Sequence, residues 1–157
     1  MNEEQKTSMK RAIFPGSFDP FTIGHYDIVM RGLKLFDEIV IGIGRNSTKK
    51  ETFPIREREE AIQKIFRDEP RVRVMIYDCL TVDFAKQQDS RFILRGIRCV
   101  SDFEYERNMA EANKQLGDVE TVILYTRPEY AHISSTLVRD LYSYNKDVSA
   151  FVPNKLR

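Results

Sequence analysis

Residues 14–25 read Phe-Pro-Gly-Ser-Phe-Asp-Pro-Phe-Thr-Ile-Gly-His, and the rest of the chain is organised around them. The apolar run from Arg11 to Phe14 predicts the end of a short buried strand. The residues that follow recur at helical spacing, namely Tyr26, Val29, Leu33 and Phe36. The stretch therefore predicts a turn from a strand into a helix. Such a turn gathers free backbone N–H groups and the positive end of a helix dipole, where phosphate binds.

Three residues of this turn favour a ligand site. Thr22 is a good helix-capping residue, three positions before His25. Gly24 would let the backbone approach a ligand, and His25 would place an imidazole in the first helical turn, facing it. The alternative is a capped helix with a surface histidine.

The composition describes one ordinary globular domain. The chain has 157 residues, of which 41% are hydrophobic and 31% charged, and its net charge of +1 argues against a nucleic-acid binder. No apolar run is long enough to span a membrane, and the N-terminus lacks the apolar core of a signal peptide. We therefore expect a cytoplasmic protein with no membrane partner. The polar residues 1–8 predict a flexible leader before a domain at 9–157.

Strand-like and helix-like segments alternate along the chain. Strands are predicted over 38–43, 72–77, 91–94 and 120–125, and helices over 56–68, 82–88, 101–116 and 134–144. With the first strand and helix, this order predicts an α/β fold: a single Rossmann-like domain with a five-stranded parallel sheet and helices on both faces. Ligands of such sheets bind at the carboxyl ends of the strands. No dinucleotide fingerprint and no P-loop is present.

Several polar segments follow the predicted strands. Lys49 lies in a polar loop, where a solvated surface lysine is the ordinary explanation. Arg95-Gly96-Ile97-Arg98 places two guanidinium groups around a glycine, an arrangement that suits phosphate. Ser134, Ser135 and Thr136 precede the last helix and resemble a phosphate cradle, with simple N-capping as the alternative. The two cysteines, Cys79 and Cys99, lack metal-ligand spacing, so we expect no metal site.

Together these segments resemble the phosphopantetheine adenylyltransferases, a bacterial family of nucleotidylyltransferases with a TxGH motif. The matching segments are PGSFDPFTIGH at 15–25, Lys49-Lys50, RGIR at 95–98, DFEYE at 102–106 and ISSTLVR at 133–139. The resemblance covers about residues 9–153. It implies transfer of AMP from ATP to 4′-phosphopantetheine, giving dephospho-coenzyme A and pyrophosphate in the penultimate step of coenzyme A biosynthesis. It also implies Mg²⁺ with ATP, a homo-hexamer, and coenzyme A as a candidate feedback ligand.

The resemblance further implies roles for individual residues. His25, Lys49 and Arg98 would be catalytic, with His25 stabilising the transition state. Ser17, Lys49 and Arg95 would hold the substrate phosphate. Leu80 and Thr81 would lie along the pantetheine arm, although Thr81 stands where the family often has methionine. The positions implied to bind ATP are Ser17, Phe18, His25, Gly96, Ile97, Arg98, Glu106, Tyr130, Ala131, His132, Ile133, Ser134, Ser135 and Thr136.

These residue types suit an in-line transfer without a general base. A phosphate monoester has a second pKa of about 6, so it is largely a dianion at pH 7 and already nucleophilic. Two alternatives stay open. One is a related nucleotidylyltransferase with another phosphate acceptor, such as a cytidylyltransferase or a nicotinate-mononucleotide adenylyltransferase. The other is a nucleotide-binding regulator without catalysis, which we would expect to have lost His25 or Lys49.

Overall fold

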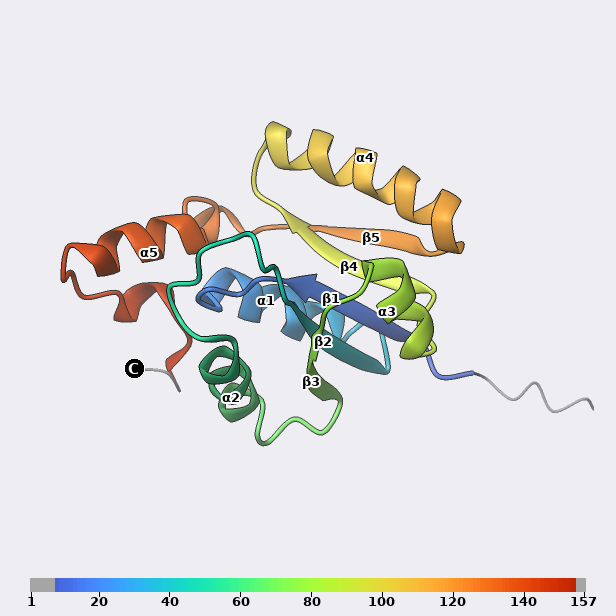
Figure 1. Ribbon diagram of the computed structural model, residues 1–157, viewed down its shortest axis with the longest axis horizontal. Coiled ribbons are helices and arrows are strands. Elements are labelled where there is room, and N and C mark those ends of the chain that lie inside the picture. The colour runs from blue at the N-terminus through green and yellow to red at the C-terminus, as the bar shows by residue number, and fades with distance from the viewer. Residues whose placement is uncertain (1–7, 155–157) are drawn as a thin grey trace, which may run out of the picture.

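Five parallel strands in the order β3-β2-β1-β4-β5 form the centre of the molecule, as a computed structural model of residues 8–154 shows (Figure 1). The strands are β1 (Arg11–Gly16), β2 (Glu38–Gly44), β3 (Val72–Tyr77), β4 (Phe92–Ile97) and β5 (Glu120–Tyr125). The helices are α1 (Ile23–Gly32), α2 (Ile55–Ile65), α3 (Thr81–Gln87), α4 (Val100–Gly117) and α5 (Ser135–Ser143), with short 3₁₀ turns η1 (Pro128–Tyr130) and η2 (Ser149–Phe151). The predicted fold class is confirmed. Residues 1–7 of the predicted leader lie outside the described residues.

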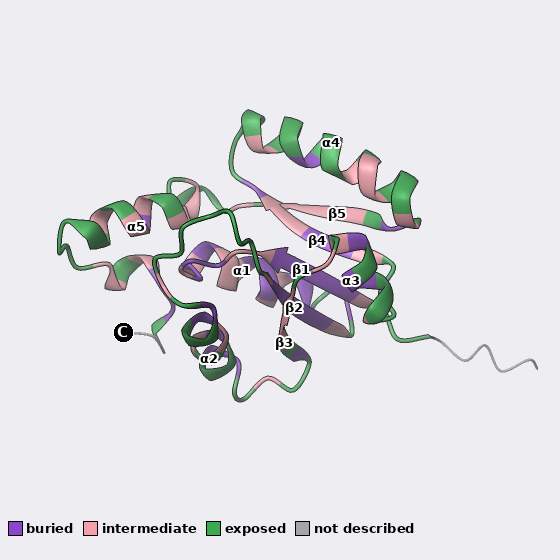
Figure 2. Cartoon of the chain, viewed as in Figure 1, coloured by how far each residue is buried: buried purple, intermediate pink, exposed green. Residues whose placement is uncertain are grey.

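Alternating side chains of the strands build two core layers. Ala12 and Phe14 of β1 pack in the layer that holds α1 and α2, whereas Ile13 between them packs in the layer that holds α3. The central strands are therefore buried on both sides, which explains their unbroken apolar sequence (Figure 2).

Strands β1 and β4 part toward their carboxyl ends. β1 pairs with β2 along its whole length, from Arg11 to Gly16. Its pairing with β4 is limited to Ala12 with Phe92 and Ile13 with Ile93. This is also the point where the strand order reverses, so the sheet opens at the place where α/β proteins bind ligands.

The fourth strand extends further than the sequence predicts. Arg95 and Gly96, expected to follow a strand that ends at Leu94, are inside β4 and pair with Ile123 and Leu124 of β5. The ladder with β5 explains the difference, because strand ends depend on a partner that is distant in sequence.

Helix α4 covers β4, β5 and α3, yet its apolar side chains are mostly exposed (Figure 2). The described exposed residues of this helix include Val100, Phe103, Tyr105, Met109 and Leu116, whereas its buried residue is Glu106. These apolar side chains are thus not covered by the rest of residues 8–154.

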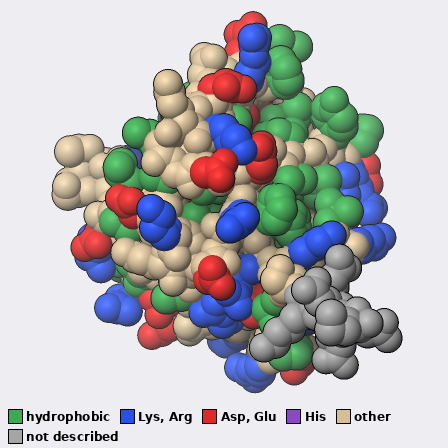
Figure 3. All heavy atoms as spheres, turned by 90° about the vertical axis from the view of Figure 1, so that its right-hand side faces the viewer, with side chains coloured by type: hydrophobic (Ala, Val, Ile, Leu, Met, Phe, Trp, Pro, Cys, Tyr) green, Lys and Arg blue, Asp and Glu red, His purple; other side chains and the backbone are tan. Residues whose placement is uncertain are grey.

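None of the helices in residues 8–154 has the length and apolar character needed to cross a membrane. On the face drawn in Figure 3, hydrophobic patches lie among Lys, Arg, Asp and Glu residues of both signs.

Candidate active site

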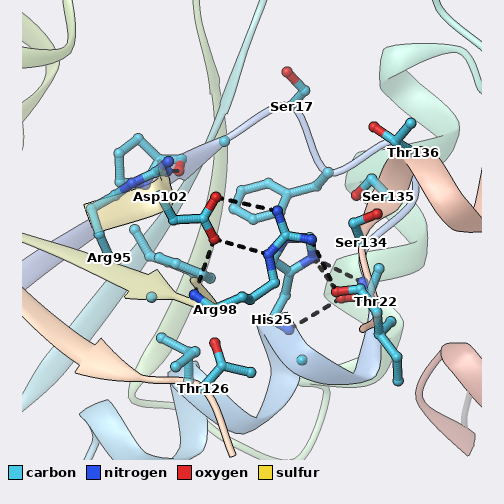
Figure 4. Close-up of a pocket in the computed structure, with 18 of the residues that line it drawn as sticks. Ser17, Thr22, His25, Arg95, Arg98, Asp102, Thr126, Ser134, Ser135 and Thr136 are labelled. Atoms are coloured by element: carbon cyan, nitrogen blue, oxygen red, sulfur yellow. Dashed lines mark hydrogen bonds and ion pairs between the residues drawn. The ribbon is translucent and has the colours of Figure 1, made fainter. Parts of the chain in front are cut away.

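A cavity of about 410 Å³ lies where β1 and β4 part. The turn at residues 16–22, called the signature turn below, forms one wall together with the start of α1. The end of β4, the first turns of α4 and the start of α5 form the others (Figure 4). The structure brings together most of the predicted residues here: Ser17, Phe18, His25, Lys49, Arg95, Gly96, Arg98, Glu106, Ile133, Ser134, Ser135 and Thr136.

His25 is held in place by the residue that caps its helix. The Thr22 backbone N–H donates to His25 Nδ1 at 2.9 Å, and the His25 backbone N–H donates to Thr22 Oγ1 at 3.3 Å. This reciprocal pair is a capping box, with histidine at the position where glutamate or glutamine is usual. Because Nδ1 accepts a hydrogen bond, the neutral ring carries its proton on Nε2, which is free to donate to a ligand.

The surroundings of His25 keep the ring neutral. Its centroid lies 5.0 Å from that of Phe18 and 5.4 Å from that of Phe21. Burial lowers the pKa of His25 to about 3, with a further contribution from the positive charges of Arg95 and Arg98. At pH 7 this side chain is therefore a hydrogen-bond donor without charge.

Each of the two predicted arginines is fixed by a carboxylate from α4. Arg95 donates to Glu106 Oε1 from Nε and Nη2, at 2.9 and 2.6 Å, and also donates to the Pro15 carbonyl. Arg98 donates from Nε to Asp102 Oδ2 at 3.0 Å (Figure 4). Both guanidinium groups are thus oriented by ion pairs before any ligand binds.

A second cavity of about 370 Å³ adjoins the first. Leu80 and Thr81, to which the resemblance assigns the pantetheine arm, line this cavity, and Cys79 lies beside them. Residues that line both cavities are Pro15, Gly16, Ser17, Arg95, Tyr105 and Glu106. The two cavities therefore meet at Ser17 and Arg95.

Four predicted ATP-binding residues do not line either cavity. Ile97 is buried at the end of β4. Tyr130, Ala131 and His132 belong to η1 and the turn after it, and the His132 ring lies edge-on to Phe151. Their roles stay predictions.

The sequence reasoning missed other residues of the site. Arg139 lines the first cavity, where it donates to the Asp19 carbonyl at 3.0 Å and to Thr136 Oγ1 at 3.1 Å. Within residues 8–154 it has no carboxylate partner, unlike Arg95 and Arg98. Its place at the end of the ISSTLVR run, one turn after Ser135, was the available signal. Asp102 also lines this cavity, although the sequence pointed to it only as the first residue of the DFEYE match.

The described residues form no cluster of three or more His, Cys, Asp or Glu side chains that could hold a metal. The two carboxylates in the wall of the first cavity, Asp102 and Glu106, are already paired with arginines. The site therefore does not fit a metal ion held by protein ligands alone.

Known proteins resemble this chain in sequence over most of its length. The chain matches the cytidylyltransferase-like family over residues 13–141. A phosphopantetheine adenylyltransferase from Bacteroides fragilis is 58% identical over 92% of this chain and 97% of its own length. Another from Flavobacterium johnsoniae is 49% identical over 95% of this chain and 98% of its own length.

Solved structures with little sequence similarity share the fold. A bifunctional NMN adenylyltransferase/ADP ribose pyrophosphatase from Francisella tularensis, complexed with AMP and a Mn ion, has a TM-score of 0.65 at 15% identity. The match covers 92% of this chain and 44% of that chain. A lipopolysaccharide core biosynthesis protein from Thermoplasma volcanium has a TM-score of 0.56 at 21% identity, covering 76% and 97% of the two chains.

Three observations identify the family of this chain. They are the family match, the high identity over nearly the whole chain, and the TxGH turn beside an arginine-lined cavity. The chain belongs to the phosphopantetheine adenylyltransferases, nucleotidyltransferases of the cytidylyltransferase-like family.

Proposed function

We propose that this protein transfers AMP from ATP to 4′-phosphopantetheine, releasing pyrophosphate and dephospho-coenzyme A. The observation that carries the proposal is the meeting of two cavities at Ser17 and Arg95. One cavity offers helix N-termini and cations to a nucleotide, and the other, lined by Leu80 and Thr81, offers room for a phosphate-bearing arm. The reacting phosphates would meet at the junction.

The arrangement suits an in-line displacement at the α-phosphate of ATP. Arg95 and Lys49 would hold the acceptor phosphate, which is already a dianion at pH 7. Its oxygen attacks the α-phosphorus, the bond from the α-phosphorus to the bridging oxygen breaks, and pyrophosphate leaves. Attacking and leaving oxygens lie on opposite sides of the phosphorus. The start of α5 belongs to the first cavity only, so it would receive the leaving group.

His25 and Arg98 would stabilise the charge that develops during transfer. His25 presents a neutral Nε2–H donor whose tautomer is fixed by Thr22, so no reorganisation is needed during the reaction. Arg139, with no carboxylate partner in the described part of the chain, would bind the leaving pyrophosphate together with Ser134, Ser135 and Thr136.

Mg²⁺ would enter as part of the substrate. This ion binds readily to substrate phosphates and water and needs few protein carboxylates. The residues of this chain then bind and orient the phosphates.

Pyrophosphate release tests the proposed function directly. The protein is incubated with MgATP and 4′-phosphopantetheine, and in parallel with MgCTP or with nicotinate mononucleotide as acceptor. We expect release that requires both ATP and phosphopantetheine. If pyrophosphate is released only with a different nucleotide or acceptor, the substrates proposed here are wrong. If the protein binds ATP without any turnover, the non-catalytic nucleotide-binding regulator is favoured.

Replacing His25 by alanine tests the mechanism. A single preorganised donor of this kind accounts for roughly 3–4 kcal/mol of barrier, so we expect His25→Ala to lower kcat at least about a hundredfold. Circular dichroism and a thermal melt would verify that the variant is folded. A folded variant with near-normal turnover would contradict the role of His25.

Three further features complete the proposal: a feedback ligand, an oligomer and a cellular compartment. Coenzyme A carries both a pantetheine arm and an adenine nucleotide, so it could span both cavities and act as a competitive feedback ligand.

The exposed apolar side chains of α4 support a homo-oligomer, with the hexamer of the family as the expected form. Because ATP is the donor, we expect the reaction to take place in the cytoplasm.

A further inference from the structure

Lys49 lies on a loop without regular secondary structure, between the end of β2 at Gly44 and the start of α2 at Ile55. The first residue of the loop is fixed, because the Arg45 backbone N–H donates to the Tyr77 carbonyl at 2.8 Å. Lys49 itself is exposed and has no ion-pair partner within residues 8–154. Its position relative to the cavity therefore depends on how the other end of the loop is held.

Asp19 holds that other end. This residue is 3% exposed, and its two carboxylate oxygens accept from the backbone N–H groups of Thr52 and Phe53, at 2.9 Å each. Asp19 belongs to the signature turn, two residues after Ser17. The turn that meets the nucleotide and the loop that carries Lys49 are thus connected through one buried carboxylate.

Arg58 makes a second connection from the first turn of α2. Its side chain is 5% exposed and donates to the Phe53 carbonyl at 2.9 Å, to Glu51 Oε1 at 2.6 Å and to the Ser17 carbonyl. A buried guanidinium is costly to desolvate, and an apolar side chain of similar size would often stabilise a helix as well. The guanidinium instead fixes the relative position of two segments. It hydrogen-bonds to Glu51 and Phe53 in the loop that carries Lys49, and to Ser17 in the signature turn.

We infer that Asp19 and Arg58 are positioning residues that set the place of Lys49 relative to Ser17. Neither side chain lines the first or second cavity, so both must act through the loops that they hold. A narrow cleft lies between the signature turn and the loop that carries Lys49; its lining includes Ser17, Lys49, Glu51 and Arg58. Ordering a flexible lysine on binding is unfavourable in entropy, and an anchored loop reduces that loss. The role given to Lys49 rests on the proposed function.

Limited trypsin digestion measures the anchoring without any turnover. Lys49 and Lys50 are exposed, and the rate of cleavage after them reports how often the loop opens. In Arg58→Met and in Glu51→Ala, we expect cleavage at this pair to become at least about fivefold faster once each rate is divided by that of an unfolded peptide with the same local sequence, since opening no longer breaks the hydrogen bonds to Arg58. The matched control is Arg56→Gln on the same helix, whose side chain is 74% exposed, and it should leave the rate unchanged.

A double-mutant cycle then tests whether Arg58 acts through Lys49. Arg58→Met should lower kcat/KM for phosphopantetheine roughly 10- to 100-fold in the natural background. In a Lys49→Ala background, Arg58→Met should lower kcat/KM for phosphopantetheine by less than about threefold, because the lysine whose position Arg58 controls is already removed. Glu51→Ala removes only one of the contacts of Arg58, the one nearest Lys49, so it should raise KM for phosphopantetheine more than KM for ATP.

An unchanged cleavage rate in both Arg58→Met and Glu51→Ala would overturn the inference. So would a double variant whose loss in kcat/KM equals the product of the losses in Arg58→Met and Lys49→Ala. If Arg58→Met does not fold, Glu51→Ala decides alone: faster cleavage after Lys49 or Lys50 supports the inference and an unchanged rate overturns it. Absence of pyrophosphate release by the natural protein with phosphopantetheine would remove the proposed function. The digestion would still show whether Arg58 and Glu51 fix the loop.

Discussion

At the scale of single residues, the site depends on groups whose protonation and geometry are set before any ligand binds. His25 is neutral because aromatic side chains and two arginines surround it, and its tautomer is set by Thr22. Arg95 and Arg98 are oriented by carboxylates of α4. Such preorganised donors stabilise developing charge without moving during the reaction.

The lowered pKa of His25 predicts an acid-sensitive fold. The folded-state value of about 3 lies below the ordinary value of 6.5, so between these limits the unfolded chain binds the extra proton. Stability therefore falls as pH drops below about 6.5, with a slope of up to about 1.4 kcal/mol per pH unit. We expect the natural protein to lose about 2 kcal/mol more than His25→Gln between pH 7 and 5, measured by urea unfolding. Equal losses would show that the ring is not kept neutral by the fold.

Gly24 gives a test of contact between backbone and ligand. A Cβ atom at this position would meet Thr22 Oγ1 at 3.5 Å and Tyr130 Cβ at 4.0 Å, which are ordinary contacts. Gly24→Ala should therefore keep the fold, with up to about 1 kcal/mol gained from helix propensity. Because Gly24 lines the nucleotide cavity, KM for ATP should rise at least about tenfold. A variant with unchanged KM would place the nucleotide elsewhere.

At the scale of elements, the N-termini of two helices line the first cavity. α1 begins after Thr22 and α5 begins after Ser134, and both capping side chains accept a backbone N–H of their own helix. The start of α5 is tied to the signature turn, because Ser135 Oγ donates to the Pro20 carbonyl at 2.8 Å. Two helix dipoles therefore converge on one cavity.

The cap of α5 can be tested by removing its hydroxyl. Ser134 Oγ accepts from the Leu137 N–H at 3.1 Å, and Ser134→Ala should cost about 1 kcal/mol of stability. We also expect weaker ATP binding, measured by calorimetry, since the first turn of α5 loses its fixed geometry. Ser134→Thr should restore both properties. Ser143→Ala, at the other end of the helix, is the control, and an equal loss of ATP affinity there would argue against a local effect.

At the scale of the whole molecule, the exposed apolar side chains of α4 predict self-association. Phe103 is 48% exposed and Leu116 67% exposed on a helix that otherwise covers the sheet. We expect sedimentation equilibrium to give the mass of six chains of 18.4 kDa, and Phe103→Glu to lower it, because a charge at an apolar interface is unfavourable. Tyr144→Glu, at an exposed residue after α5, should not change the mass. A monomeric natural protein would contradict the prediction.

Local patterns in the sequence were enough to predict much of this protein. Apolar periodicity predicted the five strands and five helices, and the TxGH stretch predicted the turn, because both signals depend on residues close together in the chain. The predicted Lys49, Arg95, Arg98 and Ser134–Thr136 segments do converge on one cavity.

Tertiary structure decided the rest, because it depends on pairs of residues that no local pattern relates. Arg58 reaches Ser17 across 41 positions, and Arg139 reaches Asp19 across 120. The opening between β1 and β4 exists because their pairing stops at Ile13 and Ile93, which depends on how the two strands pack rather than on either sequence alone. Glu106, the buried residue of α4, is likewise paired with Arg95 from a different element. The sequence determined which groups are available, and the fold determined their partners and their geometry.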